Sequence, residues 1–315
     1  MHLSPTTGDE VPLARFQGAS GTASEALARS TFRLPLLPVS GAPAEDWFIG
    51  GQGAAVQIDR EGLRGLSVGA WLLCEATRPV EGDPQTAARQ IYTDLLALLD
   101  ESGHPHVVKF WNYLSDINAG EGDEERYKQF CVGRGEAFDA AWRQDYWPAA
   151  TGVGSEAGEG LRVTVLASCK PPEIIENPRQ VSAFHYPRQY GPKSPGFSRA
   201  ALVGAPEDRL LFISGTAAIV GHDSLHVASV EAQVDETLRN WTSLFDAVAE
   251  RGEPRPSLSS ESRYRVYLRH PEHLDPVRER LEAAGLPLDQ TMFLRADICR
   301  RELLFEMDGV LALGT

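Results

Sequence analysis

The chain has 315 residues, of which 42% are hydrophobic and 23% charged, and its formal net charge at pH 7 is −14. This length predicts two domains, because a single domain usually takes about 100–200 residues. The negative charge argues against a broad surface for nucleic acid or an anionic membrane, but it allows a small anionic ligand that a few arginines hold.

No targeting or membrane signal is evident. The N-terminal segment lacks a basic stretch followed by an apolar run, and no window reaches the roughly 18 apolar residues of a membrane span. We therefore expect a cytoplasmic protein. The four cysteines are scattered without a CxxC spacing, which predicts neither disulfides nor a metal site.

Hydrophobic periodicity predicts the same order of elements twice. In the first half a helix is predicted over 86–100, a strand over 107–118 and a helix over 124–142. In the second half the predicted elements are a strand, a helix, a strand and a helix, over residues 209–215, 230–250, 264–270 and 274–285. The repetition predicts two related α+β domains.

The expected boundaries are a first domain over 1–170, a linker over 171–200 and a second domain over 201–315. The linker contains six prolines together with several tyrosine and arginine residues. A connecting segment of this length and composition is a candidate for ligand binding as well as a tether.

Residues 291–299 and 302–308 predict two strands joined by a short connection, as in a β-hairpin. Alternation along the first strand assigns Met292, Leu294, Ala296 and Ile298 to a face beneath the helices. The opposite face would then present Arg295 and Cys299, with Glu306 from the second strand beside them.

The strand over 264–270 divides in the same way and adds Arg265, Tyr267 and Arg269 to the polar face. Such a face is either solvated or forms a ligand site at an interface. Taken singly, an arginine on a strand is usually solvated or ion-paired, and a scattered cysteine usually packs as a small hydrophobe.

The strand ending in LFISG at 211–215, followed by a loop and the helix over 230–250, resembles the RidA/YjgF family of small imine deaminases. HVVKFWNYLSDIN at 106–118, with the helix after it, resembles the same part of that family. This resemblance implies an α+β fold of two RidA/YjgF-like domains, each a mixed β-sheet with helices packed on one face.

A narrower resemblance covers nearly the whole chain. FWNYLSDIN, ERYKQFCVGRGEAF, HYPRQYGPKSPGFSRA, LFISGTA and LRADICRRELLFEMDG occur in an order that is similar to the chorismatases, which include the 3-hydroxybenzoate synthases. Members of that family remove the enolpyruvyl group of chorismate as pyruvate, without a metal or an organic cofactor.

The resemblance implies roles for particular residues. Glu306 would be the general acid that protonates the enol ether, and Cys299, seven residues earlier, is the cysteine of the 3-hydroxybenzoate-forming subgroup. For the two carboxylates of chorismate, the matching motifs suggest the side chains Tyr186, Arg188, Arg269, Arg295 and Arg134. Arginine suits this role because its planar fork binds a carboxylate bidentately.

Ala217 departs from the synthase pattern, since that subgroup has glycine there and the hydrolytic subgroup has alanine. The two residues thus point to different products. Cys299 favours 3-hydroxybenzoate, which some relatives release together with 4-hydroxybenzoate. Ala217 favours hydrolysis to a dihydroxycyclohexadiene carboxylate. Two other functions stay open, an imine deaminase of the RidA type and a ligand-sensing module. Both a monomer and a homotrimer are compatible with two fused domains.

Overall fold

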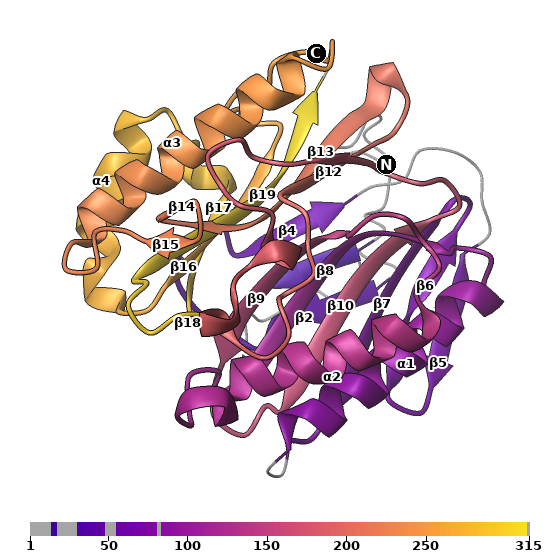
Figure 1. Ribbon diagram of the computed structural model, residues 1–315. Helices are drawn as coiled ribbons and strands as arrows, with labels where there is room; N and C mark the ends of the chain where they lie inside the picture. The colour runs from indigo at the N-terminus through magenta and orange to yellow at the C-terminus, as the bar shows by residue number, and fades with distance from the viewer. Residues whose placement is uncertain (1–13, 18–29, 48–54, 81–82, 314–315) are drawn as a thin grey trace.

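The computed structural model describes residues 14–17, 30–47, 55–80 and 83–313. Within them, two seven-stranded sheets and four α-helices make up most of the molecule (Figure 1). None of the described helices is long and apolar enough to cross a membrane.

The first sheet has the strand order β18-β9-β8-β10-β7-β6-β5. Its strands are β5 (Val56–Arg60), β6 (Leu63–Val68), β7 (Trp71–Arg78), β8 (His106–Ser115), β9 (Ala149–Ser155), β10 (Leu161–Ser168) and β18 (Asp297–Ile298). The helices α1 (Pro84–Glu101) and α2 (Arg126–Ala141) pack on its outer face through one apolar cluster (Figure 1).

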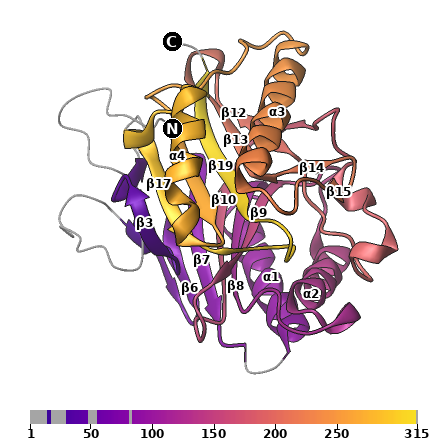
Figure 2. The ribbon, with the colours of Figure 1, turned by 90° about the vertical axis from the view of Figure 1, so that its left-hand side faces the viewer.

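The second sheet has the order β11-β12-β13-β19-β16-β17-β3. Its strands are β3 (Leu37–Gly41), β11 (Glu173–Ile175), β12 (Ala200–Val203), β13 (Arg209–Ala217), β16 (Arg263–Leu268), β17 (Thr291–Arg295) and β19 (Phe305–Leu313). The helices α3 (Val230–Ala249) and α4 (Leu274–Ala283) cover its outer face (Figure 2).

Smaller elements complete the chain. A three-stranded sheet contains β1 (Ala14–Gln17), β2 (Ser30–Arg33) and β4 (Ala44–Trp47), and a short ribbon contains β14 (Ile219–Val220) and β15 (Asp223–Ser224). The 3-10 helices are η1 (Gly122–Glu124), η2 (Ala183–His185), η3 (Arg188–Tyr190), η4 (Pro206–Asp208), η5 (Pro271–His273) and η6 (Leu288–Gln290).

Local sequence explains where the long helices begin and end. The side chain of Asp83 accepts a hydrogen bond from the backbone N–H of Gln85, and Pro84 occupies the first helical position of α1. The hydroxyl of Ser229 caps α3 by accepting from the N–H of Ala232. After α4, Gly285 has a φ of +85°, which favours glycine and ends the helix where the sequence predicts.

The predicted repeat is confirmed at the level of topology. The central strands follow the order β7-β10-β8-β9 in one sheet and β13-β19-β16-β17 in the other, and α1 and α3 occupy equivalent places, as do α2 and α4. Each sheet is mixed, with a parallel pair, β8 with β9 and β16 with β17, among antiparallel neighbours. The predicted α+β class, with helices on one face of each sheet, is therefore correct.

The two sheets also exchange edge strands. β3, from the N-terminal part of the chain, pairs with β17 at the edge of the second sheet (Figure 2). β18, from the C-terminal part, pairs with β9 at the edge of the first sheet. Each sheet is therefore completed by a strand that belongs in sequence to the other half.

The predicted hairpin over 291–308 is wrong. β17 and β19 are not neighbours, because β16 lies between them and pairs with both. After β17 the chain crosses to the first sheet as β18 and returns to enter the second sheet between β13 and β16. Alternation predicted extended chain in both places but joined β17 and β18 into one strand, and it carries no information about which strand pairs with which.

The predicted faces of β17 are reversed. Met292 and Leu294 belong to a cluster between the two sheets, whereas Phe293 packs beneath the helices. Both sets are apolar because β17 is buried on both sides, so the periodicity could not distinguish them.

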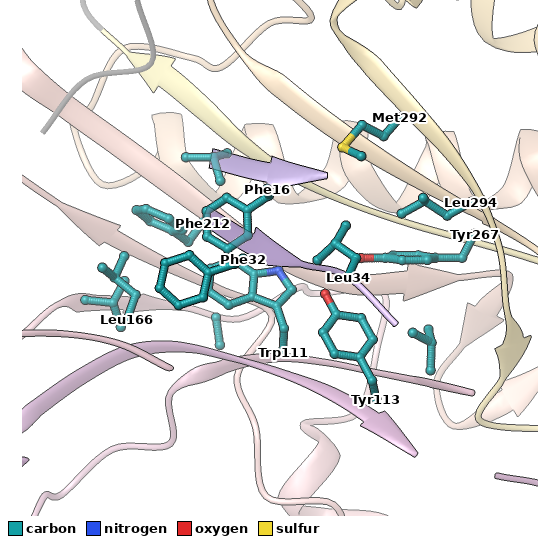
Figure 3. Close-up of a cluster of buried hydrophobic side chains, with 14 of the residues drawn as sticks. Phe16, Phe32, Leu34, Trp111, Tyr113, Leu166, Phe212, Tyr267, Met292 and Leu294 are labelled. Carbon is teal, nitrogen blue, oxygen red and sulfur yellow. The ribbon is translucent and has the colours of Figure 1, made fainter. Parts of the chain in front are cut away.

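The space between the sheets holds a large aromatic core. Figure 3 shows its members from both sheets and from the small sheet, among them Phe32, Trp111, Phe212 and Tyr267. The ring centroids of Trp111 and Phe212, which belong to different sheets, are 6.5 Å apart. Burial of this much apolar surface joins the two halves into one body.

Candidate active site

A cavity of about 230 Å³ lies where the two halves of the molecule meet. Its wall is formed by α2, β9, the ends of β13 and β19, the segment after β18, and the connecting residues 180–199. A space of this size suits a small molecule, and its wall combines apolar rings with a few charged groups.

Glu306 is the second residue of β19. Its side chain lines the cavity and is only 4% exposed. In the sheet it stands opposite Ala217 of β13 and Tyr267 of β16. β13 has an irregular register between Ile213 and Thr216, which places Gly215 beside the carboxyl group. A β-carbon at Gly215 would lie 2.2 Å from Oε1 of Glu306, so glycine is needed here to seat the acid.

Burial and, after it, the nearby carboxylate of Asp308 raise the pKa of Glu306, whereas Lys109 acts in the opposite direction, and together these effects bring the pKa to about 8. None of the described side chains donates a hydrogen bond to its carboxyl group in the structure. At neutral pH the carboxyl is therefore mostly protonated and is available as a proton donor.

Three arginines on the cavity wall have unused donors. The buried atoms Nε and Nη2 of Arg134, Nε of Arg199 and Nη2 of Arg300 have no hydrogen-bond partner among the described residues. Each of the three also donates to one backbone carbonyl, Arg134 to that of Gly196, Arg199 to that of Val181 and Arg300 to that of His222. Buried cations with free donors are suited to a ligand that carries carboxylates.

Aromatic rings hold these arginines in place. The guanidinium carbon of Arg300 lies 3.9 Å from the ring centroid of Tyr190, and that of Arg134 lies 4.6 Å from Phe138. Arg199 donates a hydrogen bond of 2.9 Å to the hydroxyl of Tyr186, which also lines the cavity. The cations are thus oriented before any ligand binds.

Cys299 lies on the same wall as Glu306 and belongs to the partly buried residues. Burial and the neighbouring Glu306 raise the pKa of its thiol, with Arg300 opposing them. The group is therefore a neutral thiol at physiological pH and is not activated as a nucleophile.

Five of the residues that the sequence suggests meet in this cavity, namely Glu306, Cys299, Tyr186, Arg134 and Ala217. Three arginines do not. Arg188 forms an exposed ion pair with Asp123, and Arg295 pairs at the surface with Glu156. Arg269 binds Asp297 at 2.6 Å and several backbone carbonyls, and thereby supports the segment after β18 from outside the cavity.

Sequence reasoning missed Arg199 and Arg300. Arg199 ends the connecting segment, whose tyrosines and arginines were already suspected of binding a ligand. Arg300 follows Cys299 directly, but strand alternation favoured Arg295, since it assumed one continuous hairpin. The actual path, in which β18 turns away from β17, brings Arg300 to the cavity instead.

A buried acid, arginines with unpaired donors and a small cavity are the features of an enzyme site suited to proton transfer to an anionic organic substrate. The family model for "Chorismatase FkbO/Hyg5-like, N-terminal" matches residues 46–167. The chain is 33% identical to a chorismatase from Streptomyces rapamycinicus, over 98% of this chain and 95% of that protein. It is 35% identical to a 3-hydroxybenzoate synthase from Streptomyces hygroscopicus, over 80% of this chain and 77% of the relative.

A solved chorismatase structure superimposes with a TM-score of 0.84 at 30% identity, over 98% of this chain and 96% of that one. At this coverage the match extends through both seven-stranded sheets. The chain therefore belongs to the chorismatase family.

Proposed function

We propose that this protein cleaves the enolpyruvyl ether of chorismate and releases pyruvate and 3-hydroxybenzoate, with Glu306 as the general acid. The observation that carries the proposal is the buried carboxyl of Glu306, whose pKa is raised to about 8 inside a cavity lined by arginines. The names of the relatives, chorismatase and 3-hydroxybenzoate synthase, support it.

The reaction begins with a proton on carbon. An enol ether is unreactive until its methylene carbon is protonated, which gives an oxocarbenium ion and requires an acid that keeps its proton at neutral pH. An ordinary glutamate is ionised at that pH, so the burial of Glu306 supplies the protonation state that the step needs.

Chorismate and the two products have the same atoms, so no water is consumed when 3-hydroxybenzoate forms. Glu306 gives one proton to the methylene carbon. The neighbouring ring hydroxyl then displaces pyruvate from the ring carbon, losing one proton, and the resulting arene oxide opens to the phenol. The proton from the hydroxyl restores the acid, and the cycle closes without a cofactor.

Chorismate carries two carboxylates, and the free donors of Arg134, Arg199 and Arg300 match them in chemistry. Their positions on different elements, α2, the connecting segment and the segment after β18, would fix both ends of the substrate against the acid. Tyr186, hydrogen-bonded to Arg199, would position the second of these cations.

The ring product depends on what surrounds the reacting carbons. Cys299 lies on the cavity wall, and the resemblance to the subgroup that carries a cysteine at this place favours the 3-hydroxybenzoate route. Ala217 stands directly opposite Glu306 in the ladder between β13 and β19 and favours the second candidate, hydrolysis to a dihydroxycyclohexadiene carboxylate. The first route can also yield 4-hydroxybenzoate.

An imine deaminase of the RidA type is disfavoured by the same carboxyl. Such an enzyme uses its glutamate to activate water, which requires the ionised form, whereas the pKa of Glu306 holds it protonated. A small imino acid has one carboxylate, whereas three arginines on the cavity wall have unpaired donors. The predicted division into domains, the cytoplasmic location and the choice between monomer and homotrimer stay predictions.

The proposal is tested by incubating the purified protein with chorismate, measuring pyruvate with lactate dehydrogenase and separating the aromatic products by chromatography. We expect pyruvate and 3-hydroxybenzoate in equal amounts. A release of pyruvate no faster than the spontaneous breakdown of chorismate would overturn the proposal, and a dihydroxycyclohexadiene product would select the hydrolytic alternative.

Glu306→Gln provides the matched variant, because the amide keeps the shape of the side chain but has no acidic proton. We expect pyruvate release to fall by about a thousandfold or more, since general acid catalysis typically contributes 10²–10⁴-fold. The thermal midpoint at pH 9 should be at least that of the wild type, because the variant removes a carboxylate that is buried and ionised there. A variant that keeps its activity would exclude Glu306 as the acid.

A further inference from the structure

Behind the cavity wall lies a second buried carboxylate, Asp308, which is two residues beyond Glu306 on β19 and 2% exposed. It is not part of the cavity lining. Its Oδ2 accepts hydrogen bonds of 3.0, 3.1, 2.5 and 3.2 Å from Lys109, Trp111, Thr151 and Tyr267. Three of these donors belong to the first sheet, so Asp308 is held from both halves of the molecule.

Two of the same donors also hold the irregular part of β13. The ammonium group of Lys109 donates to the carbonyl of Ile213 at 2.6 Å, and Oγ1 of Thr151 accepts from the N–H of Gly215 at 3.1 Å. Gly215 is the residue against which the Glu306 carboxyl rests. Asp308 therefore orients the two groups that fix the seat of the acid.

We propose that Asp308 is a positioning residue for Glu306: it aligns Lys109 and Thr151, which fix Gly215, and it places a carboxylate beside the acid. The inference rests on the proposed function, in which Glu306 is the proton donor. It adds a role for a side chain that does not touch the substrate cavity.

The charges around Glu306 support this assignment. The other titratable groups that face it come from β8, α2, β16 and the segment after β18, and they are Lys109, Tyr127, Tyr267 and Cys299. Burial raises the pKa of both phenols and of the thiol, so all three are neutral near pH 7. Burial also lowers the pKa of the Lys109 ammonium group to about 8, so Lys109 loses its charge over the pH range in which Glu306 ionises. After burial itself, the charges of Asp308 and Lys109 decide how readily Glu306 ionises.

Asp308→Asn tests the proposal because it removes the charge and keeps an oxygen acceptor for the surrounding donors. We expect the alkaline limb of the kcat/KM profile for pyruvate release to move about one pH unit lower, as a lost like charge within a site typically does. At pH 8 turnover should fall several-fold, while KM for chorismate changes little.

The matched control is Glu45→Gln. Glu45 is also a buried carboxylate of the space between the sheets, where it pairs with Arg265 at 2.8 Å, but it lies outside the cavity lining. This variant loses a buried ion pair of the same kind and should keep the wild-type limb. An equal shift in both variants would make the effect structural and would overturn the proposal.

Breaking a buried pair on one side destabilises a protein, whereas replacing both partners by neutral groups is often tolerated. Lys109→Met/Asp308→Asn is therefore the second variant, with folding checked by circular dichroism. The alkaline limb of the kcat/KM profile of this double variant should also move to lower pH, because Asp308 changes the pKa of Glu306 more than Lys109 does.

An unchanged limb in either folded variant would overturn the positioning role, as would loss of folding in both while Glu45→Gln still folds. Failure of the proposed function is distinguishable from these results, since the wild type would then release no pyruvate at all.

Discussion

At the scale of single residues, the environment of Glu306 matters more than its presence. A carboxyl group in water would be ionised at neutral pH, and burial against β13 and β16 reverses this. The position opposite Ala217, with Gly215 behind it, leaves room for the carboxyl to reach the cavity. One side chain thus acquires its chemistry from strands that are far apart in sequence.

Gly215→Ala should change the position of the Glu306 carboxyl group without changing its chemistry. The added β-carbon would lie 2.2 Å from Oε1 of Glu306 and would displace the carboxyl, although the backbone at this position allows alanine. We expect pyruvate release to fall by at least about tenfold with far-ultraviolet circular dichroism unchanged, since a misplacement of about 1 Å is costly in catalysis.

Gly152→Ala is the comparison for this variant. Its β-carbon would meet the ring of Tyr127 at 3.5 Å, which is an ordinary contact, so its loss of activity should be much smaller. Equal losses in the two variants would show that the cavity wall in general, and not the seat of Glu306, limits the reaction.

At the scale of elements, the segment after β18 brings Cys299 and Arg300 to the cavity, and Arg269 holds that segment. The guanidinium group of Arg269 donates hydrogen bonds to Asp297 and to the backbone carbonyls of Ile298, Arg300 and Leu303. The bonds fix the path of a segment that has little regular secondary structure of its own.

Arg269→Lys should loosen this segment, because a lysine cannot reproduce the planar set of five donors. We expect kcat/KM for chorismate to fall about tenfold and Cys299 to react faster with a thiol reagent, measured in a Cys169→Ser background that removes the exposed cysteine. Arg295→Lys, which alters a surface ion pair, is the control. Unchanged thiol reactivity in Arg269→Lys would contradict the supporting role.

At the scale of the whole molecule, the site exists because two similar sheets pack together. The cavity takes its acid from the second sheet, Arg134 from a helix on the first, and further cations from the connecting and C-terminal segments. Neither sheet supplies all of these groups. The exchange of β3 and β18 fixes the relation between the two sheets.

The sequence predicted the parts of this arrangement that depend on local pattern. The helices and central strands follow from periodicity, and the repeat follows from their order. It could not predict that β19 inserts between β13 and β16, because strand pairing is decided by contacts over long distances in the chain. The assumption of one continuous hairpin also explains why strand alternation favoured Arg295 over Arg300, since β18 leaves β17 for the first sheet.

The linker shows the opposite case. Its composition suggested a ligand-binding segment, and Tyr186 lines the cavity, but the arginine of this segment on the cavity wall is Arg199 and not Arg188. Arg188 is drawn to Asp123 at the surface, while Arg199, which precedes a buried strand, is held in the interior. Burial distinguishes the two residues, and burial is a property of the folded chain.

The most direct test of the central claim is the pH dependence of pyruvate release by the wild-type protein between pH 5.5 and 9.5, followed as kcat/KM for chorismate. Both substrate carboxylates are ionised throughout this range, so the enzyme's own groups determine the profile. Because the folded-state pKa of Glu306 is about 8, its acid form is lost as the pH rises through that value. We expect a plateau at neutral pH and a fall of about tenfold per pH unit above 8. A rate that instead increases through this range would show that the ionised carboxylate is the active form, and would contradict the assignment of Glu306 as the acid.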